Sequence, residues 1–150
     1  FSALTVRENI EVSALVAQTS RERQPPDVDA LVAAAGLWEV RDRRARELDY
    51  GTSRRLELAR AAAMSPSFLL LDEPTSGMSD AESTSMIEQV RLMAGVIGAG
   101  VVVIDHDLNF ITGICDRIYC LDQGRVIAHG TPDEVRNNQD VIDAYLGVQH

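Results

Sequence analysis

The chain has 150 residues, of which 45% are hydrophobic and 25% charged, a composition typical of a globular protein. The formal net charge of −9 argues against nucleic acid as the main partner, because binding to phosphates needs a basic surface. The apolar runs are too short for a membrane-spanning helix, and the N-terminal segment lacks the pattern of a signal peptide.

The first part of the chain predicts two helices. Thr5 and Glu8 stand at capping-box spacing in front of an apolar helical stripe, so a helix is expected to begin there. A polar linker with two prolines, residues 19–27, ends it. The second helix is expected to begin around residues 27–29 and to stop at Gly36.

The middle of the chain holds a charged stretch, after which helices and strands alternate. The arginine-rich stretch 39–51 could be a binding patch, but its interleaved acidic residues favour a solvated helical face. A strong helix is predicted over 53–64. The apolar run 68–71 predicts a strand, and the lack of alternation predicts burial on both of its faces, as in a parallel sheet. A helix over 79–94 and a strand within 99–107 follow.

The last third predicts a short helix over 108–115, two strands around a turn at 122–124, and a short helix capped by Thr131. A final helix is expected to close at Gly147. The fold class is therefore α/β, with a helical region followed by part of a parallel-sheet core. We place the border near residue 50, which gives a helical subdomain over 1–50 and a core part over 51–150.

Four single residues lack a motif. Cys115 and Cys120 have no metal-ligand spacing and are expected to be small core residues of a reduced, cytoplasmic protein. His129 and His150 are expected at the surface.

Two adjacent carboxylates, Asp72 and Glu73, follow the apolar run 68–71 directly, and His106 follows the next predicted strand. Ligands of parallel sheets bind outside the carboxyl ends of the strands, where these side chains could converge. An aspartate suits Mg²⁺, and an adjacent glutamate could deprotonate a water that attacks a phosphoryl group. The alternative is that Asp72, Glu73 and Pro74 only end the strand as turn-forming residues.

The order of motifs supports the first interpretation. The sequence LDYGTSRRLELARAAAMSPSFLLLDEPTSGMSD, residues 48–80, followed by VVVIDHD, resembles the ATPase subunits of ATP-binding cassette (ABC) transporters. That family has a signature of the form LSGGQ or LSYGQ, an arginine-rich helix, a Walker B strand ending in DEP, a D-loop and a switch histidine. More loosely, LTVRENI resembles the segment after the family's Q-loop, and GRVIAHGTPDEV its closing hairpin and helix. The resemblance implies a P-loop NTPase fold of the ABC type.

The resemblance implies ATP and Mg²⁺ as cofactors and assigns a role to each matching residue. Asp72 would position Mg²⁺, Glu73 would polarise the attacking water, and His106 would contact the γ-phosphate. The signature would cover ATP bound to the opposite subunit; its residues are Leu48, Asp49, Tyr50, Gly51 and Thr52. The D-loop would cross the dimer interface; its matching residues include Ser76, Gly77, Ser79 and Asp80.

One expected motif is missing. The phosphate-binding loop G-x-x-x-x-G-K-[ST] is absent, because all 14 basic residues are arginine. The glycine-rich stretch 95–100 precedes a strand instead of following one, and we interpret it as a loop. Since the first residue is Phe1 and the family's phosphate-binding loop lies upstream, we expect the chain to be the distal part of a nucleotide-binding domain, inactive by itself.

Two signature positions depart from the family pattern, with Asp49 in place of serine and Thr52 in place of glutamine. A carboxylate about 4 Å from a phosphate charge costs about 4 kcal/mol at an effective dielectric near 20, which would weaken the ATP site. Alternatively, Asp49 caps the following helix and leaves backbone amides to face the phosphate. Both interpretations remain open. In the D-loop, Ser79 stands where the family usually has Asp or Asn.

The strings LTVRENI, RRLELARA and VIDAYLG look most like the ATPases of branched-chain amino acid uptake. The resemblance then implies a dimer of cassettes, as homo- or heterodimer, docked on permease domains at the cytoplasmic face of the membrane. A second hypothesis is a degenerate or regulatory cassette with Asp49 as its defect. A third is an ABC protein of DNA repair or translation, but the acidic balance gives no indication of one.

Overall fold

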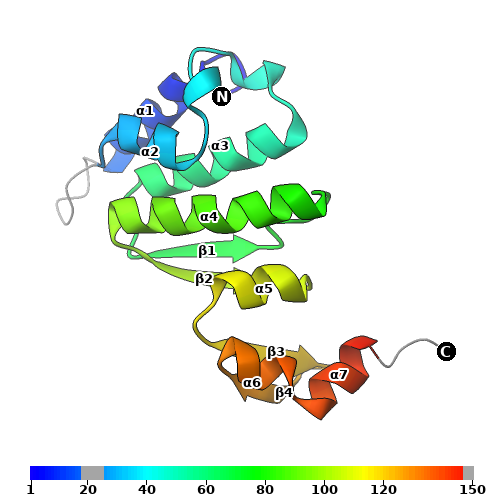
Figure 1. The fold of residues 1–150 in the computed structure, drawn as a ribbon. Coiled ribbons are helices and arrows are strands. Elements are labelled where there is room, and N and C mark those ends of the chain that lie inside the picture. The colour runs from blue at the N-terminus through cyan, green and yellow to red at the C-terminus, as the bar shows by residue number, and fades with distance from the viewer. Residues whose placement is uncertain (18–25, 147–150) are drawn as a thin grey trace. The chain divides into compact units, whose positions relative to one another are not determined.

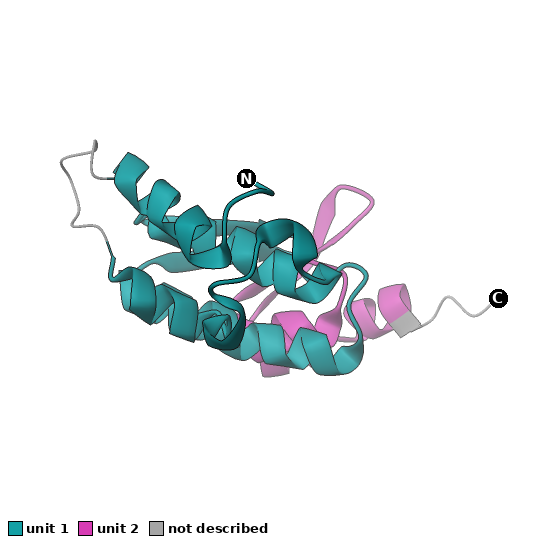
Figure 2. Ribbon diagram, turned by 90° about the horizontal axis from the view of Figure 1, so that it is seen from above, with its two compact units in different colours: residues 1–104 teal, residues 105–150 magenta. Residues whose placement is uncertain are grey.

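The computed structural model describes residues 1–17 and 26–146, which form two compact units, 1–104 and 105–150 (Figure 2). The first unit holds α1 (Val6–Ala17), α2 (Val28–Ala34), η1 (Trp38–Val40), η2 (Ala45–Glu47), α3 (Tyr50–Ala63), β1 (Phe68–Asp72), α4 (Asp80–Ile97) and β2 (Gly100–Ile104) (Figure 1). The second holds α5 (Leu108–Ile114), β3 (Ile118–Asp122), β4 (Arg125–Gly130), α6 (Pro132–Arg136) and α7 (Gln139–Leu146). The border near residue 50 stays a prediction.

The first unit is built around packed helices. Helix α1 packs on α3, while α2 and α3 both pack on α4. Three of these helices contribute fully buried side chains, Ile10, Leu31 and Met93, and burying each one stabilises the fold by about 1.5–3 kcal/mol. The predicted capping box is confirmed, since the Thr5 amide donates to the Glu8 carboxylate at 2.7 Å. None of the helices in the described part of the chain is long and apolar enough to cross a membrane.

Strands β1 and β2 form a parallel pair in which Leu70 lies opposite Val102 and Asp72 opposite Ile104. The prediction that β1 is buried on both faces is wrong. Leu69 is 2% exposed, whereas Leu70 is 76% exposed. Alternate residues of a strand face opposite sides of the sheet, and the described elements bury only the side that carries Leu69. The other side is apolar and exposed; it carries Phe68, Leu70, Val102 and Ile104.

The predicted helical face over 39–51 is also wrong, because this stretch forms the two short turns η1 and η2 before α3 begins. Besides the short-range bonds of these turns, its backbone also pairs with the N-terminal segment. The Val6 amide donates to the Arg43 carbonyl at 2.9 Å, and the Ala45 amide donates to the Leu4 carbonyl at 2.9 Å. These long-range bonds use backbone groups that a helix would need for its own ladder.

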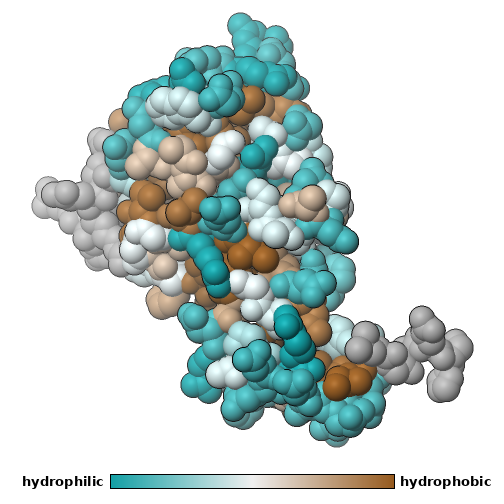
Figure 3. All heavy atoms as spheres, in the orientation of Figure 1, coloured by the Kyte–Doolittle hydropathy of each residue, from teal (hydrophilic) through white to brown (hydrophobic). Residues whose placement is uncertain are grey.

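Two helix boundaries differ from the prediction. Helix α3 begins at Tyr50, before Gly51, because Asp49 is its N-cap. Helix α4 continues past residue 94 to Ile97 and ends at Gly98, whose φ of +62° gives the left-handed conformation common at helix ends. On the face seen in Figure 3, apolar atoms gather over the helices of the first unit. Among the exposed apolar side chains of α4 are Leu92 and Val96.

The second unit contains the predicted hairpin and helices. Gln123 and Gly124, with φ of +44° and +78°, turn β3 into the antiparallel β4 as a two-residue hairpin loop requires. Thr131 caps α6 as predicted, in a capping box with Glu134. Cys120 is buried and Cys115 half-buried, and burial raises the pKa of both thiols. The predicted helix end at Gly147, like most of the linker 19–27, lies outside the described residues.

Candidate functional site

The two adjacent carboxylates lie at the carboxyl end of β1. Asp72 is the last residue of the strand and stands opposite Ile104, the last residue of β2. The Glu73 amide continues the ladder by donating to the Ile104 carbonyl at 2.7 Å. Both side chains belong to exposed residues. The parallel pairing therefore brings Asp72 and Glu73 to the sheet edge at which ligands of parallel sheets bind.

Glu73 has an unusual backbone conformation, with φ of +43°. A non-glycine residue in the left-handed region is held there by its surroundings, and such residues cluster at functional sites. Here the Ile104 carbonyl fixes the Glu73 amide, and the Glu73 carbonyl accepts a bond from the Ser76 amide at 3.1 Å across a turn with Pro74 at its second position. The sequence indicated the turn but not this conformation.

The conformation of Glu73 leads to a stability prediction. Glu73→Gly is expected to be more stable than Glu73→Ala by about 0.5–1 kcal/mol, because the left-handed region disfavours a Cβ, although the freer unfolded chain of glycine offsets part of the gain. Urea unfolding of both variants measures the difference. The same pair at the exposed Glu88, inside α4, is the control, and there glycine should be the less stable by about 1 kcal/mol. The prediction would be contradicted if the glycine and alanine variants had the same order of stability at residues 73 and 88.

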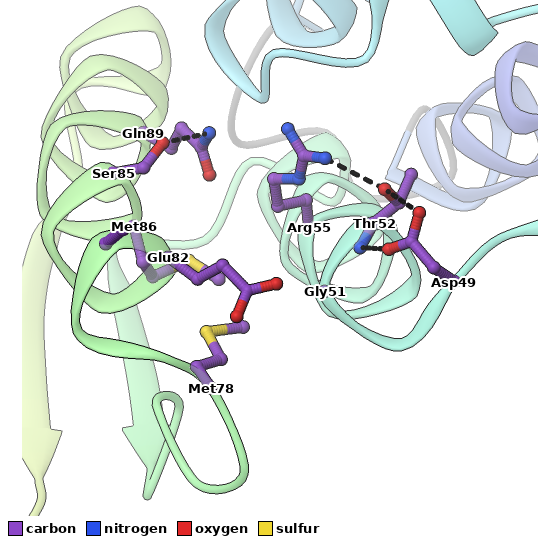
Figure 4. A pocket seen from close by; sticks show the side chains of 10 residues that line it. Asp49, Gly51, Thr52, Arg55, Met78, Glu82, Ser85, Met86 and Gln89 are labelled. Atoms are coloured by element: carbon purple, nitrogen blue, oxygen red, sulfur yellow. Dashed lines mark hydrogen bonds between the residues drawn. The ribbon is translucent and has the colours of Figure 1, made fainter.

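The start of α3 is built around Asp49 (Figure 4). Its carboxylate accepts hydrogen bonds from the Thr52 amide at 2.8 Å and from the Thr52 hydroxyl at 3.0 Å. The capping interpretation of Asp49 is confirmed, with the difference that the helix starts at the next residue. The amides of Tyr50 and Gly51 have no acceptor among the described residues, so this helix end keeps two N–H groups available for an anion.

The cap has a pH dependence. The N–H and O–H of Thr52 lower the pKa of Asp49, so its contribution to stability is present above the ordinary pKa of an aspartate and is lost as the pH falls through the lower folded value. Asp49→Ala should lower the free energy of unfolding by about 1 kcal/mol at neutral pH and by less in acid. Urea unfolding at the two pH values measures this difference. Asp49→Asn, also a good cap, should keep most of the stability; an acid-dependent loss in that variant would assign the effect to another group.

Helix α3 and the first turns of α4 line a pocket of about 400 Å³ that is open to solvent (Figure 4). Arg55 lines it and donates to the Thr52 hydroxyl at 2.8 Å and to the Gly36 carbonyl at 3.2 Å. Opposite, Glu82 accepts from the Ser79 hydroxyl and amide, which lower the pKa of its carboxyl. A Cβ at Gly51 would lie 3.0 Å from the Glu82 carboxylate, so α3 and α4 meet closely at their N-terminal ends.

The predicted D-loop residues lie beside the predicted signature residues. Ser79 is the N-cap of α4, in a capping box with Glu82, and Asp80 is its first residue. The Tyr50 hydroxyl donates to the Ser76 carbonyl at 3.0 Å, across 26 positions of sequence. The first unit therefore brings together two of the predicted groups, residues 48–52 and 76–80. Sequence spacing alone gave no sign of this contact.

His106, another predicted site residue, belongs to the second unit. It is exposed, with a side chain 74% accessible, and its Nδ1 lies 3.6 Å from Oδ1 of Asp105. The Asp105 side chain is fully buried and accepts a hydrogen bond from the Asp107 amide at 3.0 Å. Asp107 in turn caps α5. The sequence singled out His106 but missed Asp105, which the run of polar residues after the strand could have indicated.

The donor set at the carboxyl end of β1 limits what metal it can hold. Among residues 1–17 and 26–146, no group of three or more His, Cys, Asp or Glu side chains is placed to bind a metal ion. Mg²⁺ is usually held by one or two carboxylates together with water and substrate phosphates. Asp72 fits that use, with the remaining ligands supplied by a nucleotide.

Comparisons with known proteins place the chain in a family. The family described as ABC transporter matches residues 1–76, and that described as branched-chain amino acid ATP-binding cassette transporter matches residues 125–150. The chain belongs to the ABC transporter family. The ABC resemblance and the fold class predicted from the sequence are therefore confirmed.

Two curated relatives show the range of transport systems among similar ABC proteins. The high-affinity branched-chain amino acid transport ATP-binding protein LivG of Salmonella typhimurium is 44% identical over 112 residues, covering 75% of this chain and 44% of LivG. The lipopolysaccharide export system ATP-binding protein LptB of Haemophilus influenzae is 35% identical over 150 residues, covering 99% of this chain and 62% of LptB. The chain thus spans about half the length of these relatives.

Solved structures agree on the fold. The ATP-binding cassette MJ1267 in its ADP conformation has a TM-score of 0.73 at 23% identity, covering 97% of this chain and 64% of that one. The cbiO1 structure from Clostridium perfringens, part of the ABC transporter complex cbiONQ, has a TM-score of 0.75 at 24% identity, covering 99% and 59%. At these identities the likeness establishes the fold alone.

Proposed function

We propose that this chain is the distal part of a nucleotide-binding domain that hydrolyses ATP to drive uptake of branched-chain amino acids through an ABC transporter. The observation that carries the proposal is the carboxyl end of β1, where Asp72 and Glu73 stand side by side and Glu73 adopts a left-handed backbone. Non-glycine residues with a left-handed backbone cluster at functional sites, and this supports a role for Glu73 at such a site.

Each predicted residue has a role in this reaction. Asp72 holds Mg²⁺, which when bound neutralises charge on the phosphate oxygens. Glu73 accepts the proton of the attacking water, and His106 donates a hydrogen bond to the γ-phosphate. In the opposite subunit's site, the amides at the start of α3 hold phosphate oxygens, because a helix N-terminus favours negative charge.

The transported solute is inferred from similarity. LivG is a branched-chain amino acid transport protein and more similar to this chain than the export protein LptB, and the match over residues 125–150 is to the branched-chain amino acid class. By the same reasoning the partners are a second ATPase subunit and membrane permease domains, with the ATPase peripheral on the cytoplasmic face. The chain alone should neither bind ATP tightly nor hydrolyse it, because it has no lysine for a phosphate-binding loop.

The proposal is tested with the intact nucleotide-binding protein reconstituted with its permease in vesicles. ATP hydrolysis and uptake of radiolabelled leucine are measured together, with a permease-free preparation as control. Hydrolysis coupled to leucine uptake supports the proposal. Hydrolysis without uptake of any branched-chain amino acid would keep the ATPase and remove the solute assignment.

A second candidate is a degenerate cassette, which binds a partner cassette without efficient hydrolysis. The observation in its favour is that Asp49 is exposed and that its pKa is lowered, so a negative charge persists beside the amides of Tyr50 and Gly51. Asp49→Ser in the intact protein separates the two candidates. We expect ATPase activity within about twofold of the unmutated protein, since serine also caps helices. A tenfold or larger rise would favour the degenerate cassette.

A further inference from the structure

Tyr50 occupies the middle of the signature segment and yet reaches the D-loop of its own chain. It is the first residue of α3, and its side chain crosses to the loop after β1. Its hydroxyl donates to the Ser76 carbonyl at 3.0 Å. Its ring lies against Gly77, since a Cβ built there would be 3.4 Å from Cε1 of Tyr50. The side chain thus makes one polar and one packing contact with neighbouring loop residues.

Arg54, one turn further along α3, holds Tyr50 in this position. Its Nε donates to the Tyr50 hydroxyl at 3.1 Å, and its guanidinium carbon lies 5.2 Å from the centre of the Tyr50 ring. The hydrogen bond to Tyr50 is the main cause of the raised pKa of Arg54. The Tyr50 oxygen accepts from Arg54, which directs its own proton to the Ser76 carbonyl. A hydroxyl used on both sides is fixed more firmly than one with a single partner.

The loop that Tyr50 contacts is itself a pair of turns. The Ser76 amide donates to the Glu73 carbonyl at 3.1 Å, and the Met78 amide donates to the Thr75 carbonyl at 3.0 Å. Gly77, with φ of +79°, occupies the third position of the second turn, where a positive φ is needed. Ser76 therefore belongs to the turn that also fixes Glu73. Its carbonyl meets Tyr50 and its amide closes the turn at Glu73, so one residue makes both contacts.

We propose that Tyr50 is a positioning residue that locks the D-loop onto the signature helix, so that both face the opposite subunit as one surface and Glu73 is held in its reacting orientation. The inference rests on the proposed function for its effect on ATP hydrolysis, but the link itself is a property of the fold. Nothing in the sequence motif requires it, because the signature and the D-loop are matched separately. Tyr50 acts through Ser76 and does not contact the reacting atoms.

The test is Tyr50→Phe in the intact protein, which removes the hydroxyl and keeps the ring on Gly77. Amide hydrogen exchange of the loop 75–78 should become about two- to tenfold faster, because one net hydrogen bond is lost. The kcat of ATP hydrolysis should fall by a similar factor while KM for ATP stays within about twofold, since the lost contact positions groups for the transition state. Tyr119→Phe is the control: it loses the same hydroxyl in the second unit, where its ring stacks on His129.

The outcomes separate the link from the function. Unchanged exchange over 75–78 would overturn the link. Faster exchange with unchanged kcat in an active protein would overturn the positioning role. If the unmutated protein hydrolyses no ATP, the proposed function and the effect on hydrolysis fall together, while the exchange result still decides whether Tyr50 holds the loop. An equal fall in kcat for Tyr119→Phe would show that the effect does not depend on the contact between Tyr50 and Ser76.

Discussion

Glu73→Gln in the intact protein is expected to lower the kcat of ATP hydrolysis by about 10²–10⁴-fold, the usual contribution of a general base. Glutamine has the same shape but cannot accept the proton of the attacking water. The backbone of residue 73 should keep its bond to the Ile104 carbonyl, because that bond uses the amide and not the side chain. Binding of ATP should therefore persist, and the dimer closed by ATP should accumulate.

The measurement is steady-state ATP hydrolysis together with binding of a fluorescent ATP analogue. Glu88→Gln, on the exposed face of α4, is the matched control and should leave both unchanged. A kcat for Glu73→Gln within tenfold of the unmutated protein would exclude Glu73 as the base. Loss of nucleotide binding would instead indicate that Glu73 holds the nucleotide.

Elements whose signals are local could be predicted from the sequence. Thr5 forms a capping box with Glu8, and Thr131 forms one with Glu134. The N-terminal boundaries of α1 and α6 are therefore each determined within four consecutive residues. The strand before Asp72 is likewise a local apolar run. For these elements the residues that decide the conformation are neighbours in sequence.

Features that depend on distant partners could not be predicted. The arginine-rich stretch before α3 takes its conformation from backbone bonds to residues 4–7, whose register no local pattern encodes. One face of β1 is exposed because the described part of the chain has no element that covers it. The composition of the strand indicates only that it is apolar. The left-handed backbone of Glu73 results from a bond to β2 on one side and a turn on the other. The Tyr50–Ser76 contact needs α3 and the loop in place first.

Asp72→Asn is expected to have the second large effect, which is on the Mg²⁺ dependence of ATP hydrolysis. Asparagine keeps the size of the side chain and its place opposite Ile104, but it removes the charge that attracts Mg²⁺. The Mg²⁺ concentration for half-maximal ATP hydrolysis is expected to rise about 10–100-fold, the usual cost of changing a group that orients a metal's ligands. At saturating Mg²⁺ much of the kcat should return, because Glu73 is intact.

A Mg²⁺ titration of ATP hydrolysis measures this effect and distinguishes it from that of Glu73→Gln, whose kcat should stay low at every Mg²⁺ concentration. Asp122→Asn is the control, since Asp122 also ends a strand and is exposed but lies in the hairpin of the second unit. An unchanged Mg²⁺ requirement in Asp72→Asn would remove Asp72 from the metal site. The two carboxylates are adjacent at one strand end. Recovery of kcat by Mg²⁺ in Asp72→Asn but not in Glu73→Gln would therefore show that the charge of Asp72 binds the metal and that of Glu73 acts on the water.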